Sequence, residues 1–97
     1  MNAIYKYPIP FKERQEIDLP KNAQIIRVED VDGFNYLWAI VNTDENVETE
    51  KRYLELYKTG VEITTDLRDL KYLGTCKMFV QMEICLYVFE NIKKTML

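Results

Sequence analysis

The two cysteines are the first residues to examine for chemistry. Cys76 and Cys85 lie nine residues apart, which is not the spacing of a Cys-x-x-Cys redox pair. The chain contains no histidine, so it can form neither a Cys-His nucleophile nor a His-ligated zinc site. We therefore expect each thiol to be a small apolar filler, with a disulfide between them as the alternative. We expect no metal and no cofactor.

Carboxylates are the other source of catalytic chemistry. Asp66 and Asp69 flank Arg68 and would be the best residues for an enzyme that works through acidic, tyrosine and arginine side chains. Loop carboxylates of this kind usually cap turns in solvent, so we predict no enzymatic activity. The acidic run from Asp44 to Glu50 is interpreted as a solvated loop, with mimicry of nucleic acid as the alternative.

Aromatic and basic residues are the better candidates, because they can bind a ligand without catalysis. Aromatic rings can stack on a nucleobase while arginine and lysine hold its phosphates. Aromatic residues also suit strands, so packing in the core and at its rim is the competing interpretation. The residues that we single out for ligand binding are Arg27, Arg52, Tyr53, Tyr57, Arg68 and Lys71.

Length and charge limit the class of protein. A chain of 97 residues is enough for one domain. With 13 basic against 16 acidic residues and a net charge of −3, binding to duplex nucleic acid is not expected. No apolar run is long enough for a transmembrane helix, and the first residues lack the pattern of a signal peptide. We expect neither a membrane partner nor export from the cytoplasm.

Short alternating segments predict a fold built mainly of β-strands. In these segments Ile17 and Leu19 are expected to face the core, as are Ile26 and Val28, and Asp30 to Gly33 has the Asp-Gly signal of a hairpin. The close spacing predicts a single small antiparallel β-sandwich or flattened barrel of about six to seven strands, with one short helix allowed. We expect one β-rich domain over residues 1–90 and a peripheral C-terminal tail over residues 91–97. The predicted strands cover residues 3–8, 15–19, 24–31, 34–42, 71–80 and 82–90.

Residues 43–60 are compatible with two structures. Thr43 or Asp44 would cap a helix that ends at Gly60. The segment from Arg52 to Tyr57 also alternates as a strand does, with two tyrosines and a glutamate on one face. The residues alone leave helix and strand open.

Two predicted strands are apolar on both faces, which means that both faces must be covered. Residues 34–42 suit a central strand. In residues 82–90, Ile84, Leu86 and Val88 point one way, and Cys85, Tyr87 and Phe89 point the other. Either the strands lie at the centre of a sandwich, or one face is an interface between copies of the chain. We predict self-association, most simply as a C2 dimer, through Ile84, Leu86, Tyr87, Val88 and Phe89.

Several short motifs follow one another in a fixed order along the chain. They are Tyr7-Pro8, Leu19-Pro20 through Ala23 and Ile25, Leu37-Trp38-Ala39 with Val41, Tyr72 with Gly74-Thr75, and Val88-Phe89-Glu90. Their order resembles a small uncharacterised family of proteins encoded by tailed bacteriophages. The match covers nearly the whole chain, although Tyr87 stands where that family often has a histidine. The resemblance implies phage origin, a compact β fold and a strand over residues 50–58, and it implies no enzymatic activity.

These observations lead to two hypotheses of function. The first is a non-catalytic phage accessory protein in the host cytoplasm that blunts a bacterial defence. It would either sequester a nucleotide immune signal at a subunit interface or cover a host defence protein. The second is a structural or assembly component of the phage particle.

Overall fold

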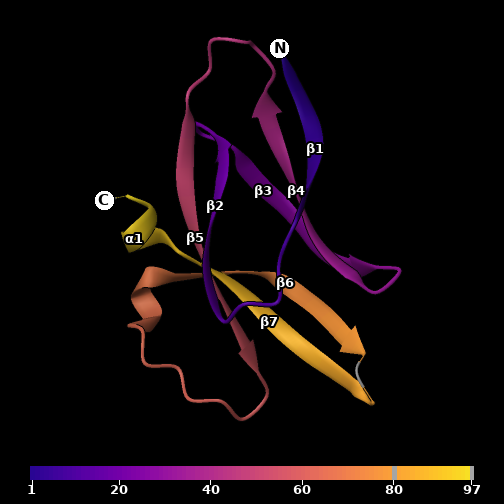
Figure 1. Ribbon diagram of the computed structural model, residues 1–97. Coiled ribbons are helices and arrows are strands. Elements are labelled where there is room, and N and C mark those ends of the chain that lie inside the picture. Colours follow the sequence, from indigo (N-terminus) through magenta and orange to yellow (C-terminus); the bar gives the residue numbers. More distant parts are fainter. Residues whose placement is uncertain (80, 97) are drawn as a thin grey trace.

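Figure 1 shows the chain as a computed structural model, which describes residues 1–79 and 81–96. Val80, predicted to end a strand, and Leu97, predicted to belong to the tail, lie outside the described residues. The described strands are β1 (Asn2–Pro8), β2 (Arg14–Pro20), β3 (Gln24–Val31), β4 (Phe34–Asn42), β5 (Thr49–Lys58), β6 (Leu70–Phe79) and β7 (Glu83–Asn91). A 3-10 turn, η1 (Leu67–Asp69), precedes β6, and a helical turn, α1 (Ile92–Thr95), follows β7.

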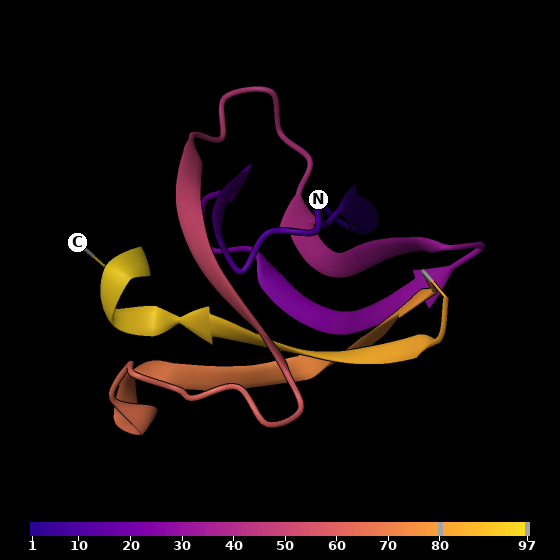
Figure 2. The same ribbon diagram turned by 60° about the horizontal axis from the view of Figure 1, so that its bottom comes forward.

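The strands form two antiparallel sheets that pack on each other (Figure 2). One sheet has the order β1-β4-β3 and the other has the order β2-β5-β7-β6. The Cα atoms span 43 × 32 × 16 Å, so the molecule is flattened. These features confirm the predicted fold class of a mainly β domain with one short helix.

The core lies between the sheets and follows from the alternation of the strands. On β4, Leu37, Ala39 and Val41 face inward and are buried, which matches the predicted central position of this strand. The other sheet contributes inward side chains from all four of its strands. The buried core residues are Ile9, Leu19, Ala23, Val28, Leu37, Ala39, Val41, Leu54, Leu56, Cys76, Leu86 and Val88.

The β3–β4 hairpin turns through two residues, as the Asp-Gly signal predicts. Val31 pairs with Phe34, and Asp32 and Gly33 between them have φ angles of 51° and 84°. Such a turn suits the right-handed twist of the strands, and glycine adopts the second position without strain.

The inward positions of β3 differ from the prediction at one residue. The register of β3 against β4 shifts between Ile25 and Arg27, which is a β-bulge. As a result Ile25 packs against the core, Ile26 is 44% exposed, and Val28 is buried. The strict alternation used for the prediction placed Ile26 inward because it allowed for no extra residue in the strand.

Residues 49–58 form a strand, which settles the choice that the sequence left open and agrees with the resemblance. The residues before it form a loop, in which Val47 N–H donates to the Asp44 carbonyl at 3.2 Å. β5 pairs with β2 on one side and with β7 on the other. These non-local pairings override the local helix signals of the segment.

The C-terminal tail carries a helical turn that packs beside β5. Asn91 caps α1 by accepting a hydrogen bond from Lys94 N–H at 3.0 Å. Figure 1 shows α1 at the side of the sandwich, beside β5. Among the described residues, no helix has the length and apolar character needed to cross a membrane.

Gly74 allows β3 and β6 to approach each other where the two sheets meet. Its φ angle is +150°, and a Cβ built on it would lie 3.2 Å from Val28 Cβ. Nearby, Lys77 N–H donates to the Asp30 carboxylate at 2.9 Å. The close contact explains why a glycine occupies this strand position.

Replacing Gly74 by alanine should therefore destabilise the fold more than the same change at Gly60. Gly60 also has a positive φ, +88°, but nothing lies within 4 Å of its added Cβ. Each change brings about 1–3 kcal/mol of backbone strain, and Gly74→Ala adds an overlap with Val28. Urea unfolding of both variants measures the difference. Equal losses would show that the approach of β3 to β6 imposes no constraint.

Candidate functional site

Three of the predicted ligand-binding residues line one hollow at the α1 end of β5. Arg52 and Tyr53 come from β5 and Lys71 comes from β6. The hollow has a volume of about 820 Å³, within the range of small-molecule sites. Its other lining residues come from the β2–β3 turn, from β5, from the end of β7 and from α1 with the residue after it: Asn22, Ala23, Glu50, Lys51, Glu90, Ile92, Thr95 and Met96.

A buried ion pair forms the floor of this hollow. Arg52 Nε donates to Glu90 Oε2 at 2.5 Å and Arg52 Nη2 donates to Oε1 at 2.9 Å. Arg52 Nη1 donates to the Ala23 carbonyl at 2.7 Å. The two side chains are only 10% and 3% exposed. The hydrogen bonds to Glu90 raise the pKa of Arg52 above its ordinary value, although burial opposes them.

The fold explains why these two charges meet. Arg52 lies on the inward face of β5, in line with Leu54 and Leu56, and Glu90 lies on the inward face of β7, in line with Val88. Both residues stand at the end of the apolar stretch of their strand. The alternation therefore turns them toward each other at the edge of the core.

Polar groups of α1 and of the β2–β3 turn complete the network. Thr95 Oγ1 donates to Glu90 Oε2 at 3.0 Å and accepts from Tyr53 N–H at 3.1 Å. Glu50 lies 3.8 Å from Arg52 Nη1 and accepts from Asn22 N–H at 3.2 Å. The buried charges thus have partners on four separate segments of the chain.

The charge that remains at the mouth is basic. Both acidic side chains of the lining, Glu50 and Glu90, face Arg52. Lys51 pairs with Asp18 at 3.2 Å. Lys71 is exposed and forms no ion pair within the described residues. Lys71 is therefore the cation best placed to meet an anion in the hollow, which Tyr53 also lines.

The other three predicted binding residues lie elsewhere. Arg27 is on the outer face of β3, where its guanidinium stacks 4.5 Å from the centroid of the Trp38 ring and pairs with Glu29. Arg68 is in η1 and pairs with Asp66 at 2.7 Å, with 88% of its side chain exposed. The prediction joined residues by type alone, and type does not show on which face of which sheet a residue lies.

Tyr57, which the sequence singles out for ligand binding with packing as the alternative, is buried. It lies on the outer face of β5, only 6% exposed. The loop between β5 and β6 lies against this face, because Thr65 in the loop donates to Glu55 Oε1 at 2.7 Å. Tyr57 OH also donates to Glu55 Oε1, and Asn91 Nδ2 donates to Oε2 at 2.8 Å. The sequence showed the alternation of Tyr53, Glu55 and Tyr57 but not the loop that covers it.

The residues predicted for an interface divide between the two faces of β7. Leu86 and Val88 are buried in the core of the same chain, and Ile84 packs against that core. Leu86 and Val88 therefore face the core of their own chain and leave little surface for a second copy, whereas Ile84 stays half-buried. Tyr87 and Phe89 lie on the outer face, where Tyr87 is 37% exposed.

A row of aromatic rings crosses the outer face of the four-stranded sheet from β5 over β7 to β6. The Phe89 ring centroid lies 6.0 Å from that of Tyr57 and 5.4 Å from that of Tyr72. Tyr72 is 55% exposed. The β5–β6 loop therefore covers one end of this row and leaves the other end in solvent.

Both cysteines are free thiols in the structure. Cys76 is buried in the core, where burial raises the pKa of its thiol to about 12. A thiol with that pKa stays protonated and unreactive at neutral pH. Cys85 faces the other side of the sheet, opposite Lys77, so no disulfide joins the pair. Among residues 1–79 and 81–96, no group of three His, Cys, Asp or Glu side chains is placed to hold a metal ion.

The fold and the hollow define a small antiparallel β-sandwich with a polar recess at one end. The chain belongs to the family described as a domain of unknown function, DUF7352, whose model matches residues 1–96. No curated protein and no solved structure matches the chain.

Breaking the Arg52–Glu90 pair from one side should strongly destabilise the fold. Arg52→Met leaves the Glu90 carboxylate buried without its partner, which costs about 3–5 kcal/mol. The double variant Arg52→Met/Glu90→Met should recover much of this loss, because no uncompensated charge stays buried. Lys51→Met, at the exposed neighbouring position, is the control. Urea unfolding measures all four proteins, and an Arg52→Met variant as stable as the control would contradict the assignment.

The Glu55 carboxylate should make stability depend on pH. Burial alone would raise the pKa of Glu55, but the hydrogen bonds from Tyr57, Asn91 and Thr65 lower it below the ordinary value. The stabilisation is therefore present at neutral pH and is lost as the pH falls through the folded-state pKa.

Glu55→Gln should lower the free energy of unfolding by about 1–3 kcal/mol at pH 7. The difference in this free energy between the variant and the unaltered protein should become smaller toward about pH 3. Unfolding by urea across this pH range measures the gap. Glu62→Gln, at an exposed position in the covering loop, is the matched control. A gap that does not change with pH would mean that Glu55 is not the linked group.

Proposed function

We propose that this protein is a non-catalytic binding protein whose hollow beside α1 takes an anionic, ring-bearing ligand of the nucleotide class. The observation that supports it most is that Arg52, Tyr53 and Lys71 line the same hollow. Lys71 would meet a phosphate, Tyr53 would lie against the ring of the ligand, and Arg52 would hold the floor in place through Glu90.

The division of roles follows from which hydrogen bonds are already made. Arg52 already donates three hydrogen bonds to Glu90 and Ala23. Its main role is therefore to hold the floor of the hollow in place rather than to bind the ligand. Lys71 carries its charge into solvent at the mouth. A phosphate there would gain a charge-assisted hydrogen bond without displacing a partner among the described residues.

The biological setting that we propose comes from the resemblance to phage-encoded proteins. In that setting the protein would bind a nucleotide immune signal in the host cytoplasm, with a second copy closing the hollow in a C2 dimer. A β-sandwich of this size with aromatic rings in solvent at Tyr72 and Tyr87 is compatible with such an association.

Lys71→Ala should weaken nucleotide binding by about 10- to 100-fold, the value of a charge-assisted hydrogen bond. Isothermal titration calorimetry with cyclic dinucleotides, cyclic ADP-ribose and ADP measures the affinity. Lys77→Ala is the matched control, because it removes the same charge from the other end of the same strand. An absence of heat with every nucleotide would refute sequestration, and capture of host proteins would then test the alternative of covering a defence protein.

The second candidate function is a component of the phage particle. The acidic residues of the β4–β5 loop, Asp44, Glu45 and Glu48, and the exposed aromatic rings would then meet neighbouring particle proteins. Immunodetection in purified particles separates the two candidates, because an early accessory protein should be absent from them.

A further inference from the structure

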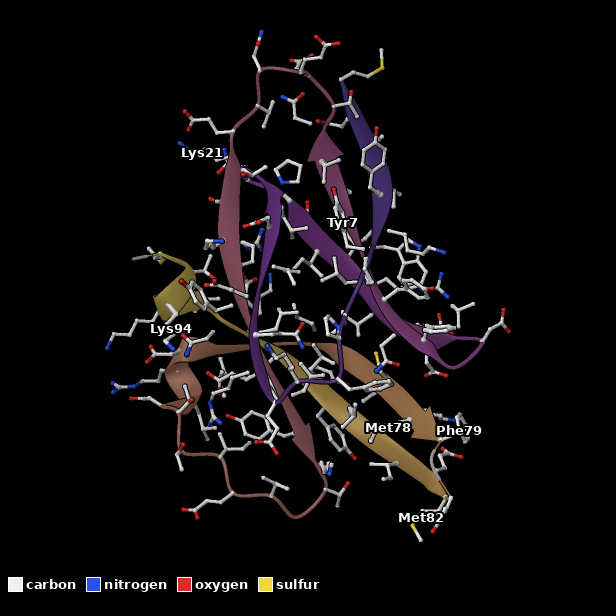
Figure 3. The ribbon with its side chains drawn as sticks, in the orientation of Figure 1. Tyr7, Lys21, Met78, Phe79, Met82 and Lys94 are labelled. Atoms are coloured by element: carbon white, nitrogen blue, oxygen red, sulfur yellow. The ribbon has the colours of Figure 1, made fainter. Side chains whose placement is uncertain are left out.

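A second cavity lies at the other end of β5 and has a different character. It has a volume of about 320 Å³ and is bounded by the segment that connects β1 to β2 and by the inner face of the four-stranded sheet. Its apolar walls are Phe11 from the connection, Leu56 from β5, Leu86 from β7, Met78 from β6 and Val61 from the loop after β5. Figure 3 labels Met78 near the β6–β7 hairpin, away from Lys94 and α1.

Hydrogen bonds hold the wall formed by the connecting segment. Leu56 N–H donates to the Glu13 carbonyl at 2.8 Å. Gln15 Nε2 donates to the carbonyls of Pro10 at 2.8 Å and of Lys12 at 3.1 Å. The segment is therefore fixed to β5 and closed on itself. The cavity has a preformed wall, as ligand sites usually do.

The apolar lining continues from the core to the solvent. Leu56 and Leu86 are each 5% exposed and belong to the core, whereas Phe11 is 51% and Val61 is 50% exposed at the rim. Water in such a cleft meets apolar walls, so an apolar group that replaces it gains hydrophobic free energy. Methionine at position 78 adds a flexible side chain that can adapt to the shape of a ligand.

The charged residues at the rim indicate that the ligand carries a negative charge. Lys12 and Lys58 line the cavity together with one carboxylate, Glu13. Within residues 1–79 and 81–96, neither lysine forms a salt bridge. An apolar cleft with an excess of ammonium groups at its mouth is complementary to a ligand with an apolar body and an anionic head.

We propose that this cleft is a binding site for a small amphipathic carboxylate, with an acyl or aryl chain between Phe11, Leu56 and Met78 and the carboxylate near Lys12 and Lys58. The site is independent of the hollow beside α1. It shares no lining residue with that hollow, and it is apolar where the other is polar.

The test uses the full chain and three probes in two-dimensional ¹H–¹⁵N NMR titrations. Octanoate, below the concentration at which it forms micelles, should shift the amide signals of Phe11, Leu56 and Val61. Octanol, with a similar chain and no charge, should bind more weakly, and acetate, with the charge and no chain, should leave the signals in place. Failure of octanoate to bind, or shifts confined to residues outside the cleft, overturns the proposal.

Two variants separate the roles of charge and of the apolar walls. Lys58→Gln should weaken octanoate binding by about five- to tenfold and leave octanol binding unchanged. Lys77→Gln, on β6 outside the cleft, should change neither. Val61→Asn alters the exposed rim without disturbing the core, and it should weaken the binding of both octanoate and octanol. If Lys58→Gln and Lys77→Gln weakened octanoate binding equally, the binding would reflect general charge attraction. That result would overturn the proposed site.

Discussion

The hydrogen-bonded pair of Arg52 and Glu90 fixes the arrangement on which the polar end of the molecule depends. Through the Ala23 carbonyl and the Thr95 hydroxyl, the pair connects the β2–β3 turn, β5, the end of β7 and α1. Burying two charges is costly, so such a pair adds less stability than its contacts suggest. The pair instead favours the correct register of β5. A slip of β5 by one residue would turn Arg52 to the outer face and leave Glu90 buried without its partner.

The same pair helps to explain why one cavity of the sandwich is polar and the other is mainly apolar. Along β5, the inward residues run from Arg52 through Leu54 and Leu56 to Lys58. The strand therefore presents charge at one end of the core, apolar surface in the middle and a lysine at the other rim. Because both carboxylates of the lining, Glu50 and Glu90, already face Arg52, the hollow beside α1 keeps the positive charge of Lys71. Among the described residues, the cleft near Lys58 contains no such ion pair, and its walls are mainly apolar.

Period-two alternation, turn chemistry and composition predict most of the fold. They placed the central strand β4, the Asp32-Gly33 turn and the inward Ile17 and Leu19. Alternation failed at Ile26, because a bulge changes the face of a residue without a signal in a single sequence. It also left residues 43–60 open, since pairing with β2 and β7 decides between strand and helix there. The Arg52–Glu90 contact joins residues 38 apart, and no local pattern contains that information.

Strands that are apolar on both faces raised the question of what covers the second face, and the structure answers it largely within one chain. On β4, the outward rings of Tyr36 and Trp38 lie under Lys6 and Arg27, at 4.4 and 4.5 Å from their centroids. Long basic side chains cover aromatic surface with their stems while the charge reaches water. On the outer face beside β7, the loop held by Thr65 and Glu55 covers Tyr57. A second apolar face is therefore not in itself an argument for a dimer. The case for self-association rests on a smaller surface than the whole outer face of β7. This surface consists of Tyr72 and Tyr87, which the described part of the chain leaves in solvent.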